Sequence, residues 1–272
     1  MNYKLLFLDY DGTLKQEPNE ISRANKEAIL SACQAGKKVS IASGRNKDLI
    51  MHTVKELQLD KFGESYTVAL NGAHIFENCS GTSLHSVPIP LNLTYLLFKK
   101  AYELEITCHV YTENYIYFNY HDDQFKWYQE EGCTCELIDM EQPGLGLKQT
   151  PLKFYLFSKD TNKLNRYKEE MDAVTKEDMN AEYSSRFSLE YTSTKASKGL
   201  GIEFICQQFG LTMDYAIAAG DGENDISMIQ MAGLGVAMKN ALDSVKAVAD
   251  TITERTCMED GVSEIINRYL LG

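Results

Sequence analysis

The chain has 272 residues, 44% of them hydrophobic, and its 39 acidic and 27 basic side chains give a formal net charge of −12. This length suits two domains with separate hydrophobic cores, and the acidic balance argues against binding nucleic acid or an anionic membrane through a broad basic face. Because the sequence has neither a run of 18 apolar residues nor a basic leader segment, we expect a cytoplasmic protein without a membrane span.

The chain begins with a predicted strand that ends in two acids. Residues 5–8 are all apolar, which is typical of a strand covered on both faces of a parallel sheet, and Asp9-Tyr10-Asp11 follows directly. Ligands of open α/β sheets bind beyond the carboxyl ends of the strands. Side chains two residues apart in an extended chain point to the same side, so we expect Asp9 and Asp11 together at a site.

A second predicted strand, residues 39–42, ends in the small polar residues Ser43 and Gly44. A helix is predicted to begin directly after Arg45. The Ser43 hydroxyl and the backbone N–H groups near Gly44 are candidates for binding phosphate oxygens, although a Ser-Gly turn can also be an ordinary helix cap.

Two further signals complete the first third of the chain. Ser22 predicts the start of a helix that ends at Gly36. Residues 66–76 consist of two apolar runs on either side of Asn71-Gly72, which predicts a β-hairpin.

The pattern changes between residues 84 and 191, which are rich in aromatic side chains and lack strands that end in small polar loops. Segments 91–104 and 161–175 predict helices, and segments 106–111, 115–118, 153–157 and 187–191 predict strands. We therefore expect an α+β cap domain, residues 83–191, inserted into a core formed by residues 1–82 and 192–272. The aromatic residues between 111 and 128 either form a wall that stacks on a substrate ring or pack within the cap.

The first pattern resumes after residue 191. A helix is predicted from Ser197 to residue 209, and the apolar strand 215–219 ends at Gly220-Asp221-Gly222-Glu223-Asn224-Asp225. A further strand at 234–238 and helices at 241–249 and 261–271 follow. The fold class is thus α/β, with a mostly parallel sheet, helices on both faces and an inserted second domain.

Acids at two strand ends indicate a metal site. If Asp9, Asp11, Asp221 and Asp225 converge, each pair at about 4 Å repels by roughly 4 kcal/mol at an effective dielectric constant near 20. Such a cluster needs a cation, and ligands that are all oxygen suit Mg2+. Asp225 alone, at the start of a predicted helix, can also be an ordinary N-terminal acid.

The same residues suit phosphoryl transfer. Asp9 is the candidate nucleophile, which forms an aspartyl-phosphate, and Asp11 is the candidate acid and base. Asp11 has to hold a proton for this role, and we expect acidic neighbours to raise its proton affinity. A lysine that neutralises Asp9 and the phosphoryl group is also needed, and both Lys195 and Lys198 are close to the predicted helix start.

Taken in order, these motifs resemble the four motifs of the haloacid dehalogenase-like phosphohydrolases. The motifs are Asp9-x-Asp11-Gly12-Thr13, Ser43-Gly44-Arg45, Lys198-Gly199 and Gly220-Asp221-Gly222-x-Asn224-Asp225. The segments Asn71-Gly72, Asn240-Ala241 and Asp260-Gly261 resemble further markers of the Cof-like branch with a type IIB cap. The resemblance implies a Rossmann-like core, an α/β cap and Mg2+-dependent hydrolysis of phosphomonoesters.

The resemblance also implies roles for single residues. Asp9 and Asp221 would hold the metal by their side chains, Asp11 by its backbone carbonyl, and Asp225 mostly through water. Asn224 would orient the phosphate together with Ser43 and Gly44, and the motif spacing selects Lys198 over Lys195. True dehalogenases lack the second acid of the first motif, so Asp11 argues against dehalogenation.

We therefore expect a phosphatase that hydrolyses a small phosphorylated metabolite, such as a sugar phosphate, through an aspartyl-phosphate. Two alternatives remain open: a phosphomutase, which uses the same two acids, and a non-catalytic sensor of a phosphorylated ligand. The intact pair of Asp9 and Asp11 favours an enzyme over the sensor. The expected partner is a small phosphomonoester, and the sequence leaves the oligomeric state open.

Overall fold

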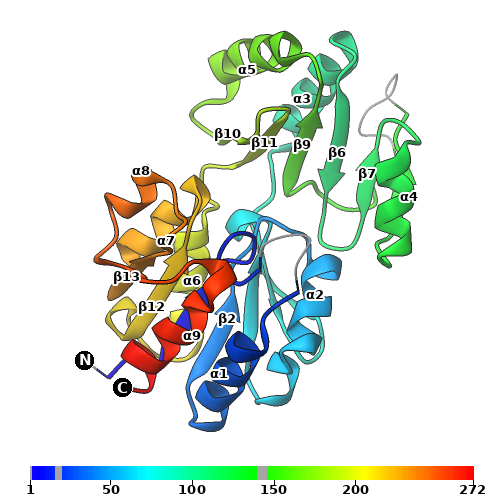
Figure 1. Cartoon of the computed structure of the whole chain (residues 1–272). Helices are drawn as coiled ribbons and strands as arrows, with labels where there is room; N and C mark the ends of the chain where they lie inside the picture. Colours follow the sequence, from blue (N-terminus) through cyan, green and yellow to red (C-terminus); the bar gives the residue numbers. More distant parts are fainter. Residues whose placement is uncertain (1, 16–19, 140–145) are drawn as a thin grey trace. The chain divides into compact units, whose positions relative to one another are not determined.

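The computed structural model describes residues 2–15, 20–139 and 146–272 (Figure 1). These residues divide into two compact units, the first within Met1–Arg45, Ile50–Leu84 and Ser197–Gly272, and the second within Asn46–Leu49 and His85–Ala196. Among the described residues, no helix has both the length and the apolar character that crossing a membrane requires.

The first unit is organised around a five-stranded sheet in the order β14-β13-β12-β1-β2, in which all neighbours are parallel. Leu5 of β1 lies opposite Ala216 of β12 on one side and Lys38 of β2 on the other. All four residues of β1 are buried, as expected for a central parallel strand. The strands are β1 (Leu5–Leu8), β2 (Lys38–Ile41), β12 (Ala216–Gly220), β13 (Leu234–Ala237) and β14 (Thr251–Ile252).

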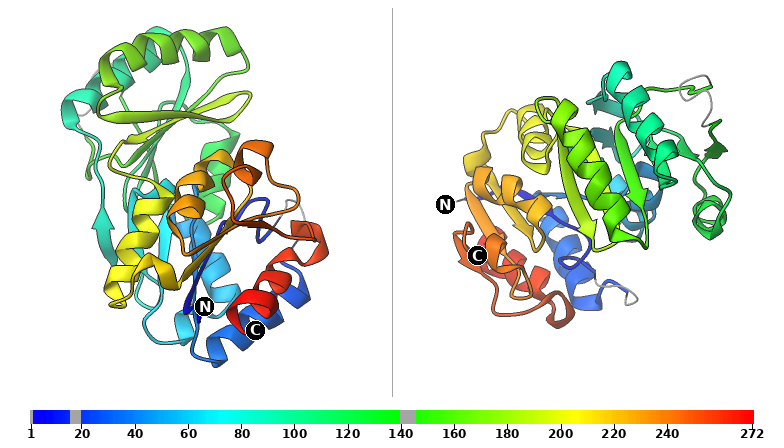
Figure 2. Two further views of the ribbon diagram at one scale, coloured as in Figure 1. Left: turned by 90° about the vertical axis from the view of Figure 1, so that its left-hand side faces the viewer. Right: turned by 90° about the horizontal axis from the view of Figure 1, so that it is seen from above.

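Helices cover both faces of this sheet. On one face α1 (Arg23–Gln34) and α9 (Gly261–Ile265) lie side by side, and on the other α6 (Lys198–Gln208) packs against α7 (Ile226–Met231), as Figure 2 shows from two further sides. One buried cluster joins the strands to α6 and α7, and its members include Leu5, Phe7, Ala216, Ala218, Ile202, Ile205 and Met228. This packing fixes the strand ends relative to the start of α6.

Serine side chains cap the first turns of two helices that the sequence predicts. The Ser22 hydroxyl accepts a hydrogen bond from the backbone N–H of Asn25, and the Ser197 hydroxyl accepts one from that of Leu200. Each therefore satisfies a donor that the first turn of a helix leaves unpaired. The remaining α-helices near this unit are α2 (Lys47–Glu56) and α8 (Asp243–Lys246).

The predicted hairpin is present in a small sheet of order β3-β4-β5. Strand β3 (Tyr66–Ala69) pairs antiparallel with β4 (His74–Glu77), and β5 (Ser83–Ser86) follows. A single parallel bridge between Ala42 and Val68 continues the pairing from the end of β2 to β3. The turn between β3 and β4 is thereby held beside the loop that follows β2.

The second unit has a six-stranded sheet in the order β10-β11-β9-β6-β7-β8. All neighbours are antiparallel except β7 and β8, which are parallel. A core of apolar side chains from α3, α5 and the sheet includes Leu97, Phe98, Val110, Phe154, Leu156, Tyr167 and Tyr191. Its elements are α3 (Leu91–Glu103), β6 (Thr107–Tyr111), β7 (Ile116–Phe118), α4 (Asp123–Glu130), β8 (Cys135–Leu137), β9 (Lys153–Phe157), α5 (Thr161–Thr175), β10 (Met179–Ser185) and β11 (Ser188–Ser193).

The aromatic residues of this unit pack on one another. The rings of Phe118 and Phe125 meet edge to face with centroids 5.1 Å apart, and the ring of His109 stacks on Tyr155 at 5.4 Å. Phe118 is fully buried. These contacts agree with the interpretation that the rings pack within the unit.

The α/β class and the parallel sheet agree with the sequence-based prediction, but several elements were not predicted. Where the sequence predicts a helix over residues 241–249, the structure has only the four-residue helix α8. Helix α4 has a single buried residue, Phe125, so it lacks the apolar periodicity that reveals a helix. The strands without a prediction are β5, β8, β10 and β14.

Candidate active site

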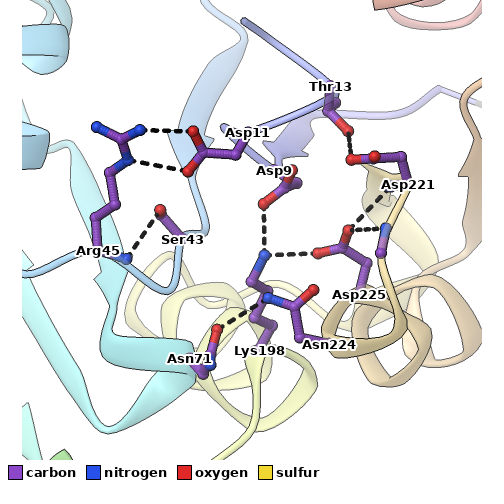
Figure 3. Close-up of polar contacts among 11 residues, drawn as sticks. Asp9, Asp11, Thr13, Ser43, Arg45, Asn71, Lys198, Asp221, Asn224 and Asp225 are labelled. Carbon is purple, nitrogen blue, oxygen red and sulfur yellow. Dashed lines mark hydrogen bonds and ion pairs between the residues drawn. The ribbon is translucent and has the colours of Figure 1, made fainter. Parts of the chain in front are cut away.

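The carboxyl ends of β1, β12 and β2 lie at the same edge of the parallel sheet and carry the candidate residues (Figure 3). The backbone N–H of Asp9 donates to the Ala219 carbonyl at 2.9 Å, so Asp9 directly continues the pairing of β1 with β12. Asp221 follows the last residue of β12. Neighbouring parallel strands thus bring residues about 210 positions apart to one place.

Three carboxylates converge at this edge. Asp9, Asp221 and Asp225 each offer a carboxylate oxygen within 4.8 Å of the other two, and Asp9 is only 5% exposed. Thr13 donates a hydrogen bond from its hydroxyl to Asp221 at 3.1 Å. The oxygen-only donor set and the burial fit a small divalent cation of the kind that prefers carboxylates.

Burial and mutual repulsion disfavour the charged forms of these acids. Burial, followed by the negative charge of Asp225, raises the pKa of Asp9 well above its ordinary value, and Lys198 only partly opposes this shift. The same two causes raise the pKa of Asp221 to about 6. A cation bound between the carboxylates would relieve both costs.

Lys198 lies at the centre of the cluster and is fully buried. Its Nζ donates to Asp9 Oδ1 at 2.5 Å and to Asp225 Oδ1 at 2.6 Å. Burial lowers the pKa of Lys198, but Asp225 and Asp9 outweigh burial and raise this pKa above its ordinary value. Lys195, the competing candidate, is exposed, so the structure brings Lys198 and not Lys195 to Asp9.

Asp225 contributes its two oxygens to different contacts. Oδ1 accepts from Lys198, whereas Oδ2 accepts from the backbone N–H groups of Asp221 and Gly222, each at 2.9 Å. Asp225 makes no side-chain hydrogen bond to the first turn of α7, so it does not cap that helix. Oδ2 instead holds the loop that precedes Asp225, and Oδ1 belongs to the cluster with Lys198. The two hydrogen bonds from the backbone also hold the Asp221 loop against the start of α7.

The side chain of Asp11 points elsewhere, which corrects the expectation of acidic neighbours around it. Its two oxygens accept from Arg45 Nε at 2.9 Å and Nη2 at 2.7 Å, in a bidentate ion pair at the edge of the site. The Arg45 guanidinium also lies over the Tyr10 ring, 4.8 Å from its centroid. Asp11 already belongs to the turn at Gly12, whose φ is 87°, so the alternation rule for strands does not place its side chain.

The predicted phosphate-binding residues Ser43, Gly44 and Asn224 meet around Asn71. Asn224 Nδ2 donates to Asn71 Oδ1 at 3.1 Å, and a Cβ atom on Gly44 would lie 3.0 Å from that same oxygen. The Ser43 hydroxyl accepts from the Arg45 backbone N–H at 3.1 Å, as a cap would. Asn71 therefore joins the loop after β2 to the loop after β12, because its backbone N–H also donates to the Ser43 carbonyl.

A family model for haloacid dehalogenase-like hydrolases matches residues 6–266. The chain belongs to this family. A 5-amino-6-(5-phospho-D-ribitylamino)uracil phosphatase of Bacillus subtilis is 30% identical, with 100% of this chain and 97% of the relative covered. A haloacid dehalogenase-like hydrolase from Bacteroides thetaiotaomicron has a solved structure with 30% identity, 98% and 99% coverage and a TM-score of 0.87. A sugar phosphatase of subclass IIB has 26% identity, 98% coverage of both chains and a TM-score of 0.82.

The family match confirms the prediction of a Cof-like haloacid dehalogenase-like hydrolase with a Rossmann-like core and an inserted α+β cap. The prediction of a phosphatase is confirmed at this level, because the relatives are phosphatases by name. The haloacid dehalogenase-like hydrolases are generally metal-dependent, and the cluster of Asp9, Asp221 and Asp225, two of them buried, agrees with this property.

Four residues at the site of this haloacid dehalogenase-like hydrolase received no role from the sequence: Thr13, Arg45, Asn71 and Asn240. Asn240 Nδ2 donates to the Gly12 carbonyl at 2.7 Å and so supports the turn after Asp11. All four lie within or beside the motif segments, which is the only signal that the sequence offered for them. Their partners depend on turns whose geometry no hydrophobic pattern encodes.

Proposed function

We propose that this hydrolase is a Mg2+-dependent phosphatase that acts on a small phosphorylated metabolite, such as a sugar phosphate, through an aspartyl-phosphate on Asp9. The observation that carries the proposal is the buried cluster in which Lys198 bridges Asp9 and Asp225 beside Asp221. The names of the relatives, a ribitylaminouracil phosphate phosphatase and a sugar phosphatase, support a substrate of this class. We further propose that residues 83–191 form the cap that selects it.

Asp9 is positioned to attack phosphorus. Lys198 holds one carboxylate oxygen of Asp9, which fixes the rotamer of the side chain and balances its charge without solvent. The second carboxylate oxygen attacks phosphorus, the bond between phosphorus and the ester oxygen of the substrate breaks, and the phosphoryl group becomes bound to Asp9 until water hydrolyses it to free phosphate. Lys198, Ser43, the backbone at Gly44 and Asn224 donate hydrogen bonds to the non-bridging phosphoryl oxygens.

The proposed metal set is Asp9 and Asp221 through their side chains, Asp11 through its backbone carbonyl, and Asp225 mostly through water. When bound, Mg2+ would neutralise negative charge on the carboxylates and on the phosphoryl oxygens. Lys198 keeps Asp225 Oδ1 engaged, so Asp225 serves the cluster mainly by holding Lys198 and the Asp221 loop.

Asp11 is the proposed acid for the leaving alkoxide and the base that later takes a proton from water. Each of its oxygens accepts one hydrogen bond from Arg45, which leaves a second lone pair on each oxygen for the transferred proton. The exposed position of the pair lets an arriving substrate reach this contact.

Turnover of an aryl phosphate with and without EDTA tests the proposal. We expect phosphate release that requires Mg2+ and that EDTA abolishes. Phosphate binding without release would favour the non-catalytic sensor. Transfer of the phosphoryl group within a sugar phosphate, with no free phosphate formed, would favour the phosphomutase. A panel of phosphorylated metabolites then ranks substrates by kcat/KM.

Metal binding should also stabilise the fold. At a Mg2+ concentration 100 times its dissociation constant, binding to the native state alone adds about 2.7 kcal/mol to the free energy of unfolding. Differential scanning fluorimetry should show the corresponding rise in Tm. An equal rise in the Asp221→Asn variant would place the ion elsewhere.

The raised pKa of Asp221 gives this stabilisation a pH dependence. The unfolded chain loses the Asp221 proton near pH 3.8, whereas the folded protein keeps it until about pH 6. Without metal, the native state therefore binds more protons in this window, and stability falls as pH rises from about 4 to about 6. Tm measured in EDTA should decline across the window, and the Tm increase caused by Mg2+ should grow across it. If the Tm increase caused by Mg2+ stayed constant across the window, Asp221 would not be a metal ligand with a raised pKa.

A further inference from the structure

The turn between β3 and β4 has an unusual backbone. Leu70 and Asn71 are consecutive residues with positive φ, 51° and 55°, and Gly72 follows at 95°. Residues other than glycine rarely adopt this region of backbone conformation, and a bulky apolar residue such as Leu70 does so less often than asparagine. All three residues are buried. A strained turn that persists in a buried place is held there by its surroundings, and such turns concentrate at functional sites.

The strained turn contacts the loop after β2 through its backbone. The Leu70 N–H donates to the Arg45 carbonyl, and the Asn71 N–H donates to the Ser43 carbonyl, both at 3.0 Å. The two residues with left-handed backbone thus both donate to the same loop. The turn therefore holds the backbone of the loop that contains Ser43 and Gly44, both of which are proposed to bind phosphate.

The same turn also contacts Asn224, a proposed phosphate ligand, and Ser197, which directly precedes the proposed ligand Lys198. Asn71 Oδ1 accepts from Asn224 Nδ2 at 3.1 Å, as Figure 3 shows. Gly72 packs so closely on the cap of α6 that a Cβ atom there would lie 2.1 Å from the Ser197 carbonyl oxygen. Lys198 is the next residue. One turn thus touches every segment that supplies a phosphate-binding group.

The Asn71 contact decides how Asn224 presents its amide. Asn224 Nδ2 faces Asn71, and Asn224 Oδ1 lies on the opposite side, 2.8 Å from where a Cβ atom on Gly222 would be. With the amide plane fixed in this way, one of the two hydrogen atoms on Asn224 Nδ2 makes the hydrogen bond to Asn71. The other hydrogen atom is left to donate to a second acceptor. Without Asn71, rotation about χ2 would exchange the donor and the acceptor.

We infer that Asn71 is a positioning residue, which orients the Asn224 amide so that it donates to a phosphoryl oxygen. The inference rests on the proposed function, because it assumes that Asn224 binds the phosphoryl group. It assigns Asn71 no contact with the reacting atoms. The strained backbone of Leu70 and Asn71 is explained by the need to place this side chain between Gly44 and Asn224.

A double-mutant cycle of Asn71→Gly and Asn224→Ala tests this inference. Glycine accepts the positive φ at residue 71, so the single variant removes the amide without adding backbone strain. We expect inorganic phosphate to inhibit Asn71→Gly about tenfold more weakly than the parent, the change typical of losing one hydrogen bond to a charged group. In the Asn224→Ala background, Asn71→Gly should have almost no further effect. The Tm increase caused by Mg2+ should stay at the parental value, because no proposed metal ligand changes.

Equal effects of Asn71→Gly in both backgrounds would overturn the inference, since Asn71 would then act independently of Asn224. The cycle is repeated with Asn71→Ala, in which any loss from backbone strain is common to both backgrounds and cancels. If the parent hydrolyses no phosphate ester, the proposed function fails instead. Inorganic phosphate can still be titrated by its effect on Tm in the presence of Mg2+, and the same cycle then tests Asn71 alone.

Discussion

Replacing Asp9 by asparagine should reduce kcat by roughly 10^5-fold, because the amide cannot form the covalent intermediate and removal of a catalytic nucleophile has effects of this size. Asparagine has nearly the same shape as aspartate, so the variant should keep the packing around β1. The measurement is initial-rate kinetics with an aryl phosphate at saturating Mg2+. Rates within tenfold of the parent would exclude Asp9 as the nucleophile.

The same substitution should affect stability in the opposite direction. Burial and Asp225 disfavour the charged form of Asp9, so a neutral side chain removes a cost that the metal-free protein bears. Lys198 keeps Asp225 as an ionic partner. We therefore expect Asp9→Asn to melt no lower than the parent in EDTA and to gain less from Mg2+. This pairing of lost activity with retained stability separates a catalytic role from a structural one.

The sequence predicted that Asp9 and Asp221 converge, because their positions depend on strand ends. A wholly apolar run followed by Asp9, and another followed by Asp221, specify both that the strand is buried and where it stops. Parallel pairing of β1 with β12 then brings the two ends together without further information. The predicted helix start left both Lys195 and Lys198 as candidates, and the motif spacing selected Lys198, which directly follows the Ser197 cap.

The sequence could not place the contacts that depend on turns. Asp11 meets Arg45 because the chain reverses at Gly12 with a positive φ, and the resulting ion pair joins two loops that share no periodic pattern. Asn71 reaches Asn224 only because two residues other than glycine adopt positive φ. Both conformations are selected by tertiary contacts against the local preference of the backbone.

Elements of the second unit were missed for a related reason. Strand β10 has mostly exposed or half-buried residues, so it carries no apolar alternation that would reveal a strand. Its position follows from antiparallel pairing with β11, which supplies backbone hydrogen bonds whatever the side chains are. Hydrophobic patterning therefore predicted the elements that contribute to a core and missed those that only extend a sheet.

Replacing Lys198 by methionine should destabilise the metal-free protein by about 3–5 kcal/mol at neutral pH, the usual cost of breaking a buried ion pair from one side. Methionine fills the space of the lysine stem but leaves Asp9 and Asp225 buried without their cation. Activity should fall by roughly 10^3-fold, because the variant also loses a charged donor to the phosphoryl group. Chemical denaturation in EDTA and initial-rate kinetics with Mg2+ measure the two effects.

Lys195→Met is the matched control, because Lys195 is exposed and lies three residues earlier in the same segment. It should change stability by less than about 0.5 kcal/mol and leave turnover unaltered.

Mg2+ should restore part of the stability that Lys198→Met loses, since the ion supplies positive charge to Asp9 in place of the ammonium group. It should not restore the rate, because the geometry that fixes Asp9 Oδ1 is gone. Recovery of both by Mg2+ would mean that Lys198 acts only as a counter-charge, whereas recovery of stability alone identifies it as a group that also positions the nucleophile.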